Sequence, residues 1–221
     1  NTDPYQRCEG KYELTRGVIE ALVEYRNPFS ILTRGTLMLR DIDLLTEAAQ
    51  VSDIATSYSV ATLDEEIWRK TEPGTPHPRK RLEAVRRLNE AGVPCGVLVA
   101  PILPGISDGL DQIKTVVEAS LDAGATHVSP ILLHLRPRVK EVYMEWLEDN
   151  YPDLVPRYQT MYRKSAYAGQ DEQDELRRTV RDIVVAAGGV RPRVRRSKVP
   201  RWRAEIERQK AQLGTEQLSL I

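Results

Sequence analysis

Short β-prone runs alternate with amphipathic helical segments along most of this chain, and this alternation constrains the fold more than any other feature. Residues 95–100 are continuously apolar, as expected of a strand that is covered on both faces. Residues 29–33, 54–60 and 127–133 are further predicted strands. Because a helical segment separates each strand from the next, the strands are predicted to be parallel, with right-handed crossovers.

The helical segments are defined by apolar residues at a spacing of three and four. Helices are predicted around residues 15–23, 39–49, 63–68, 82–91, 110–121, 139–147, 154–162 and 171–187. Thr15 is the expected N-cap of the first, and Gly92, Gly124 and Gly188 are expected to end later ones. The predicted fold class is therefore α/β, a partial (βα) barrel with four parallel strands, C-terminal helices and a tail.

The first predicted element of the chain is a helix, and no strand is predicted before it. Barrels of this kind usually have six or eight strands, and the first predicted strand would leave unpaired backbone groups at an edge. We therefore expect further residues before Asn1 in the natural protein, and poor solubility of the 221 residues alone because of the edge at 29–33.

Composition excludes several classes of protein. The chain has 221 residues, 32 basic and 32 acidic side chains and no apolar run long enough for a membrane span. The two cysteines, Cys8 and Cys95, exclude a disulfide framework and a multi-cysteine zinc site, and they predict reduced thiols in a cytoplasmic protein.

The charge is distributed unevenly. From residue 191 to the end there are nine Lys or Arg residues and three acids, which gives this tail a charge of +6 and the remainder −6. A basic tail of this kind favours an anionic partner such as nucleic acid, although a solvated terminus without a partner has the same composition. We predict a barrel domain at 1–168, a C-terminal helix at 169–189 and a basic tail at 190–221.

The active sites of such folds lie at the carboxyl ends of the strands. Arg34, Ser59, His134 and Arg136 fall at predicted strand ends, and the last two are candidate substrate-binding residues. A surface cation, a hydroxyl that satisfies a strand end and a structural histidine are the alternative interpretations of these residue types. The sequence contains no GxxxxGK[ST] loop, no GxGxxG after a strand and no His/Cys cluster with metal spacing.

Several whole segments nevertheless resemble one family. They read TDPYQ at 2–6, FSILT at 29–33, SVATLD at 59–64, EPGTP at 72–76, RLEAVRRLNEAG at 81–92, VAPILPG at 99–105 and HVSPILLHLRP at 127–137. Together they resemble radical S-adenosylmethionine (SAM) proteins of the branch that is related to spore photoproduct lyase and is called DNA-repair-photolyase-like, and we expect a bacterial source. The resemblance covers residues 1–168 and implies a partial (βα)6 barrel of which the last four strands are present.

The resemblance also implies two cofactors. In this family the three thiolates of a CxxxCxxC loop hold a [4Fe-4S] cluster, which cleaves SAM reductively to a 5′-deoxyadenosyl radical. This chain contains no CxxxCxxC motif, so it is expected to hold no metal ligands itself. The SAM-contacting residues that the resemblance implies are Thr2, Asp3, Thr33, Arg34, Ser59, Thr62, Ala100 and Leu103.

These residues have different expected partners on SAM. By resemblance, Thr2 and Asp3 approach the amino group, and Arg34, beside Thr33, pairs with the carboxylate. Ser59 and Thr62 match the ribose region, and residues 100–103 match the backbone near the adenine. The resemblance therefore implies the C-terminal part of a radical SAM enzyme. The family branch, the basic tail and the end of that tail, described next, together favour a nucleic-acid-related substrate.

The last residues suggest a protein partner. Residues 217–221 read QLSLI, which resembles the QLxLF-type peptide that docks bacterial proteins on the sliding clamp. The residues that would make the contact are Gln217, Leu218, Leu220 and Ile221.

Two other readings stay open at this point. One is a non-catalytic binding module that uses its basic tail. The other is an unrelated phosphate-binding enzyme that uses Arg34, His134 and Arg136.

Overall fold

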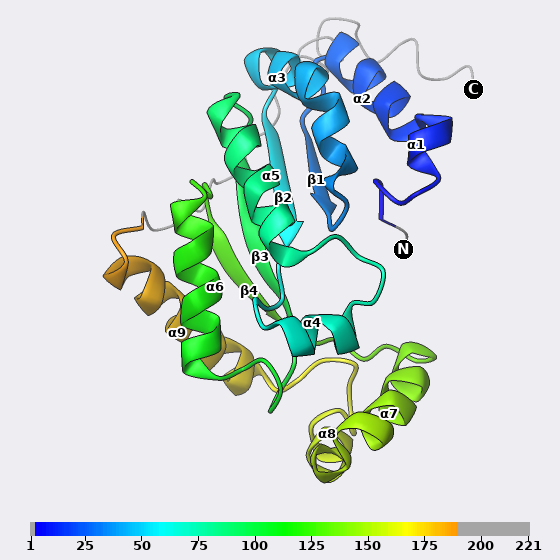
Figure 1. The fold of residues 1–221 in the computed structure, drawn as a ribbon, viewed down its shortest axis with the longest axis vertical. Coiled ribbons are helices and arrows are strands. Elements are labelled where there is room, and N and C mark those ends of the chain that lie inside the picture. Colours follow the sequence, from blue (N-terminus) through cyan, green and yellow to red (C-terminus); the bar gives the residue numbers. More distant parts are fainter. Residues whose placement is uncertain (1–2, 190–221) are drawn as a thin grey trace, which may run out of the picture. The chain divides into compact units, whose positions relative to one another are not determined.

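A computed structural model describes residues 3–189 of the chain (Figure 1). Its centre is a four-stranded sheet in the order β1-β2-β3-β4, and every neighbouring pair of strands is parallel. The strands are β1 (Phe29–Thr33), β2 (Ile54–Ser59), β3 (Cys95–Ile102) and β4 (Val128–Leu132). This confirms the predicted α/β class with four parallel strands.

Helices connect the strands in the predicted order. They are α1 (Glu9–Tyr12), α2 (Leu14–Glu24), the 3-10 helix η1 (Thr36–Asp41), α3 (Ile42–Val51), α4 (Glu65–Thr71), α5 (Pro78–Glu90), α6 (Leu110–Asp122), α7 (Val139–Asn150), the 3-10 helix η2 (Pro152–Leu154), α8 (Val155–Met161) and α9 (Gln170–Ala186). Gly92, Gly124 and Gly188 follow α5, α6 and α9 with φ of 81°, 77° and 76°, the left-handed conformation that ends a helix. Within residues 3–189, none of the helices has the length and apolar character that a membrane crossing requires.

Two local predictions were wrong. Thr15 is not an N-cap but lies inside the first turn of α2, where its N–H donates to Glu9 Oε1 at 2.8 Å and its Oγ1 donates to the Pro4 carbonyl at 2.7 Å. Leu39 lies in η1 rather than in α3, which begins three residues later at Ile42.

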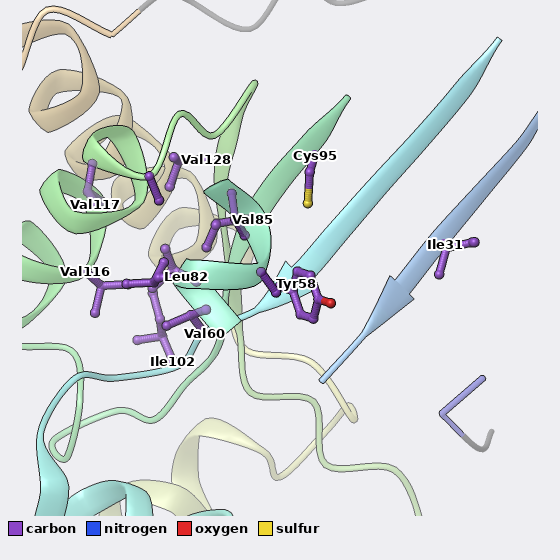
Figure 2. Close-up of a cluster of buried hydrophobic side chains, with 14 of the residues drawn as sticks. Ile31, Tyr58, Val60, Leu82, Val85, Cys95, Ile102, Val116, Val117 and Val128 are labelled. Carbon is purple, nitrogen blue, oxygen red and sulfur yellow. The ribbon is translucent and has the colours of Figure 1, made fainter. Parts of the chain in front are cut away.

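One face of the sheet packs against the helices to form the core. Figure 2 shows several buried side chains of this cluster. Tyr58 lies in β2 and Val60 directly follows that strand, whereas Val85 comes from α5 and Val116 from α6. β3 is buried along most of its length on both faces, which agrees with its continuously apolar sequence. The hydrophobic core therefore includes the sheet and the buried sides of α2, α3, α5, α6 and α9.

β1 is one edge strand of the described sheet, and β4 is the other. Among the described residues 3–189, β1 pairs only with β2. The side chain of Leu32 on this strand is 46% exposed, although it belongs to a sheet. An unpaired parallel edge was predicted here, and the poor solubility that we expect from it stays a prediction.

His127 lies across the amino-terminal end of the sheet. Its Nε2 is 3.2 Å from Ser57 Oγ on β2, and its ring lies directly over Gly96 on β3. A Cβ at position 96 would be 2.2 Å from the His127 ring. Gly96 therefore leaves the space that this imidazole fills.

A buried carboxylate connects the first helices to the rest of the fold. Asp41 is completely buried and accepts hydrogen bonds from Tyr5 Oη at 3.0 Å, Arg40 Nε at 2.9 Å and Arg16 Nη1 at 3.1 Å. Burial alone would raise the pKa of Asp41, but the hydrogen bonds from the two arginines and from Tyr5 outweigh burial and lower this pKa.

The lowered pKa of Asp41 predicts an acid-sensitive contribution to stability. A carboxyl group with a lowered folded-state pKa stabilises the protein above its unfolded pKa of about 4, and this stability is lost as the pH falls toward the folded-state value. We expect Asp41→Asn to be less stable than the wild type at pH 7 and to lose less stability between pH 5 and pH 3. Urea unfolding at several pH values measures both effects, and an unchanged acid slope in the variant would contradict the assignment.

Candidate functional site

The carboxyl ends of all four strands meet around one pocket. Arg34 follows β1, Ala61 follows β2, Leu103 follows β3 and Leu133 follows β4, and all four line this cavity of about 720 Å³. In Figure 1 the strands run toward the part of the molecule that holds α4 and α7. The remaining lining residues come from α4 and the loop after it, from Pro101 and from the α7 region: Lys70, Thr71, Glu72, Pro73, Thr75, Arg138, Val139, Val142, Tyr143 and Trp146.

We call this cavity the strand-end pocket. Its position is the one that parallel α/β folds use for ligands, because the loops after the strands converge there. Its volume lies within the range of small-molecule sites, about 300–1,000 Å³.

Two arginines share one carboxylate beside the pocket. Glu72 Oε1 is 2.9 Å from Arg34 Nε, and Glu72 Oε2 accepts from Arg81 Nη2 at 2.8 Å. Glu72 and Arg81 are buried, whereas the Arg34 side chain is 42% exposed and lines the cavity. The trio carries a net charge of +1, and its exposed member faces the pocket.

Arg81 is the centre of this network. Besides Glu72, its guanidinium donates to the carbonyls of Ser59 and Pro76, each at 2.8 Å, and to Thr75 Oγ1 at 2.7 Å. These bonds join the end of β2 to the loop between α4 and α5. Because Arg81 is satisfied on every nitrogen, it is a buried charge with full compensation.

A second network fixes the segment before α1 to the end of β1. The carboxylate of Asp3 accepts from the backbone N–H of Arg34 at 2.8 Å and of Tyr5 at 2.9 Å, and it also accepts from Thr33 Oγ1. Thr33 Oγ1 in turn accepts from the N–H of Gly35 at 2.8 Å. Asp3 therefore holds the backbone of Arg34 in place next to the strand-end pocket.

The structure brings only some of the predicted SAM-contacting residues to this pocket. Arg34 and Leu103 line it, and Ala100 is buried one residue before Pro101, which lines it. Ser59 is buried and offers its carbonyl to Arg81. Thr62 lines a different pocket, with Arg79 and Asp111, and accepts from the N–H of Asp64 at 3.0 Å.

One of the two predicted substrate residues, His134, lies apart from the strand-end pocket. His134 lines a separate pocket between β4 and α9, and its ring packs edge-on against Tyr167 with the centroids 4.5 Å apart. Burial and the nearby charge of Arg136 lower the pKa of His134. Arg34 and His134 thus line different cavities.

Other predicted residues fall outside the described part of the chain. These are Thr2 and the terminal residues Gln217, Leu218, Leu220 and Ile221. The predicted basic tail at 190–221 lies there as well.

Sequence reasoning missed Glu72, Arg81 and the pocket face of α7. A signal for Arg81 was available, because it falls on the same helical stripe as Pro78, Leu82 and Val85, which are all buried. A cation on an apolar stripe indicates a buried charge with partners nearby. The pocket face of α7 had no comparable signal, since its apolar residues fit an ordinary amphipathic helix.

The cysteines of the chain do not fit a [4Fe-4S] cluster. Cys8 is exposed, and Cys95 is buried in the core, where burial raises its thiol pKa to about 12. Within residues 3–189 no group of three His, Cys, Asp or Glu side chains is placed to hold a metal ion. No three thiolates are available in the chain, whose sequence has two cysteines.

Comparison with known proteins identifies close sequence relatives. An uncharacterized protein of Mycobacterium tuberculosis (strain H37Rv) is 40% identical over 195 residues, which cover 87% of this chain and 57% of that protein. An uncharacterized protein of Methanocaldococcus jannaschii is 24% identical over 189 residues, covering 86% of this chain and 67% of that protein. The chain thus spans about 57% of the length of its mycobacterial relatives.

Solved structures share the fold. Spore photoproduct lyase aligns with a TM-score of 0.55 at 19% identity, covering 81% of this chain and 55% of that chain. Another structure of that lyase, which holds AdoMet and a dinucleoside spore photoproduct, aligns with a TM-score of 0.54 at 20% identity. These matches support the partial-barrel fold predicted from the sequence.

The family model that matches is "Radical SAM superfamily", over residues 9–141. This match covers all four strands and more than half of the chain. The chain therefore belongs to the radical SAM superfamily.

Proposed function

We propose that this chain forms the SAM-binding part of a radical SAM enzyme barrel, and that cysteines outside these 221 residues hold the cluster. In this superfamily a [4Fe-4S] cluster and SAM supply a 5′-deoxyadenosyl radical. The observation that carries the proposal is the strand-end pocket, which lies within the family match and has Arg34 on its wall.

Arg34 is the residue best suited to hold the carboxylate of SAM. Its Nε forms an ion pair with Glu72 at 2.9 Å without a hydrogen bond, and its two terminal nitrogens have no hydrogen-bond partner among residues 3–189. A guanidinium with two free N–H groups on one edge matches a carboxylate in a bidentate arrangement. The strand ends at Ala61 and Leu103 supply apolar contacts for the remainder of the ligand.

The other implied residues have supporting roles in this proposal. Asp3 and Thr33 position the backbone of Arg34, and the carbonyl of Ser59 anchors Arg81. Ala100 lies beside the pocket at Pro101. Thr62 lies in the neighbouring pocket, so we leave it out of the proposed SAM site.

Binding of SAM tests this proposal. In the protein expressed from its complete gene, we expect Arg34→Ala to weaken SAM binding by about tenfold or more, because a charge-assisted bidentate contact is lost. Isothermal titration calorimetry measures the affinity, and Arg163→Ala, an exposed arginine outside the pocket lining, is the matched control. Equal SAM affinity in the wild type and in Arg34→Ala would overturn the assignment of Arg34.

A nucleic-acid-related substrate is the finer part of the proposal. Its support is the fold shared with spore photoproduct lyase, one structure of which holds a dinucleoside spore photoproduct, and the +6 tail. The tail and its QLSLI ending are proposed to bind nucleic acid and the sliding clamp. A clamp pull-down with and without residues 217–221 tests the second partner, and salt-dependent DNA binding with and without the tail tests the first.

A non-catalytic binding module is the second candidate. The observation that favours it is the charge of +6 on residues 191–221, which suits an anionic partner. An iron and sulfide assay on the product of the complete gene separates the two candidates. About four iron and four sulfide ions per chain would support the enzyme, and none would support the binding module.

A further inference from the structure

The helix α7 forms an apolar wall of the strand-end pocket. Val139, Val142, Tyr143 and Trp146 all line the cavity from this helix. Val139 and Val142 are 55% and 68% exposed, so two aliphatic side chains face open space from the pocket wall. An exposed apolar wall at the mouth of a cavity is a feature of ligand sites.

The aromatic residues of this wall are held by further rings. Tyr143 lies 5.3 Å from Trp146 and 5.6 Å from Tyr158, and Trp146 lies 5.7 Å from Tyr151, all measured between ring centroids. Tyr158 is completely buried, which fixes the base of the group. Tyr143 and Trp146 are therefore rigid, partly exposed rings, and they can stack on a flat ligand with little loss of side-chain entropy.

Cations surround the same wall. Arg138 immediately precedes α7 and has no hydrogen-bond or ion-pair partner for its side chain among the described residues 3–189. Lys70 lies on the α4 side, paired with the exposed Glu66 at 2.7 Å. Arg34 is the third cation of the lining, and its carboxylate, Glu72, is shared with Arg81.

The charge of the lining is therefore positive. Three of the lining residues are cationic. The carboxylate in the lining belongs to Glu72, which already pairs with two arginines. The ligand that complements this wall has negative charge at one end and a flat or apolar body at the other. A fatty acid would use the valines but not the two rings, whereas a nucleotide would use both the rings and the cations.

We propose that α7 and Arg138 form the substrate subsite of this pocket, and that the subsite binds a nucleobase with its phosphate. Tyr143 and Trp146 stack on the base, Arg138 pairs with the phosphate, and Lys70 adds positive charge. This inference rests on the proposed function, because it leaves the strand ends and Arg34 to SAM. It also moves substrate binding away from His134 and Arg136, which the sequence had favoured.

A nucleotide in this subsite could be free or part of a strand. Titration with thymidine monophosphate and with a fluorescein-labelled oligothymidylate separates these sources. The monophosphate carries a single phosphate, so its binding gains less from a polybasic tail than the binding of the strand does. Tight binding of the monophosphate indicates a free nucleotide as ligand, and binding of the strand alone indicates a nucleic acid.

The test compares Arg138→Ala and Trp146→Leu with Arg163→Ala, whose arginine lies outside the pocket lining. We expect each subsite variant to weaken the tighter probe by about tenfold, from the loss of one phosphate contact or one stacked base. Arg138→Ala should also reduce the slope of log affinity against log salt by about one, a change that Trp146→Leu should not produce. Arg138→Lys should recover part of the affinity because it keeps the charge.

SAM affinity, measured on the same samples, distinguishes a failure of the α7 subsite from a failure of the proposed SAM site. If SAM binds normally and both subsite variants bind the probes like Arg163→Ala, the α7 subsite is wrong and the SAM site stands. If the wild type does not bind SAM, the proposed function is wrong, whatever the probes show. If a variant loses both SAM binding and probe binding, far-ultraviolet circular dichroism shows whether it is folded. If Arg138→Ala is unfolded, Arg138→Lys and Trp146→Leu take its place in the test. Unchanged probe binding in both of these variants would overturn the subsite.

Discussion

Replacing Arg81 with methionine is expected to lower the free energy of unfolding by about 3–5 kcal/mol, the cost of removing one partner from a buried ion pair. The variant loses the guanidinium that bonds Glu72 and Thr75, and it leaves the carbonyls of Ser59 and Pro76 without their donor. For a chain of this size the change corresponds to a decrease in Tm of about 6–20 °C. Urea unfolding and thermal unfolding both measure it.

A matched control lies on the same helix. Arg86 also belongs to α5, but its side chain is 49% exposed and contacts Glu83 at 3.5 Å. Arg86→Met is expected to change stability by less than about 0.5 kcal/mol, because exposed pairs of this kind contribute little. Equal losses in the two variants would mean that the network of Arg81 has no special role.

A second variant tests whether the stability loss in Arg81→Met is caused by the buried charge of Glu72. Glu72→Gln removes the charge that Arg81→Met leaves without its buried partner. We therefore expect the double variant to lose less stability than the sum of the two single variants. Strict additivity would indicate that the loss comes from the carbonyls of Ser59 and Pro76 instead.

Gly96→Ala is expected to destabilise the protein by about 1–3 kcal/mol, the usual cost of overpacking a filled site. The added methyl group would lie 2.2–2.5 Å from three atoms of the His127 ring, so the ring must leave its place beside Ser57. The measurement is the urea midpoint at constant pH. A variant as stable as the wild type would show that His127 moves without cost.

Two comparisons make this prediction specific. In a His127→Ala background the same Gly96→Ala change should cost much less, because the atoms that clash are gone. Gly17→Ala in α2 has nothing within 4 Å of its added Cβ and is expected to raise stability by about 0.5–1 kcal/mol. Together they separate a steric effect at position 96 from a general effect of losing glycine.

The secondary structure was largely predictable because each element has a local signal. β1 begins and ends where its β-prone run does, at Phe29 and Thr33. β3 runs two residues further than predicted, because Ile102 still pairs with Leu132 after a shift in register. Such a shift depends on the neighbouring strand, which the sequence of β3 does not contain.

The site was only partly predictable, and the reason is the course of the chain after each strand. Arg34 follows β1 directly, so its position was fixed by the strand end. His134 also follows its strand, but the chain there carries it to the α9 side of β4. Trp146 lies on a helix that reaches the pocket through tertiary packing alone, and no local pattern reveals such a contact.

The free edge of β1 is one of the two edges at which the described sheet can be extended. Any parallel strand that joined it there would hydrogen-bond to Phe29–Thr33 and would end next to Asp3 and Arg34. Loops arriving with that strand would then border the pocket on the side of Arg34. One open row of backbone groups thus provides both a point of assembly and a way to bring new chemical groups to the ligand.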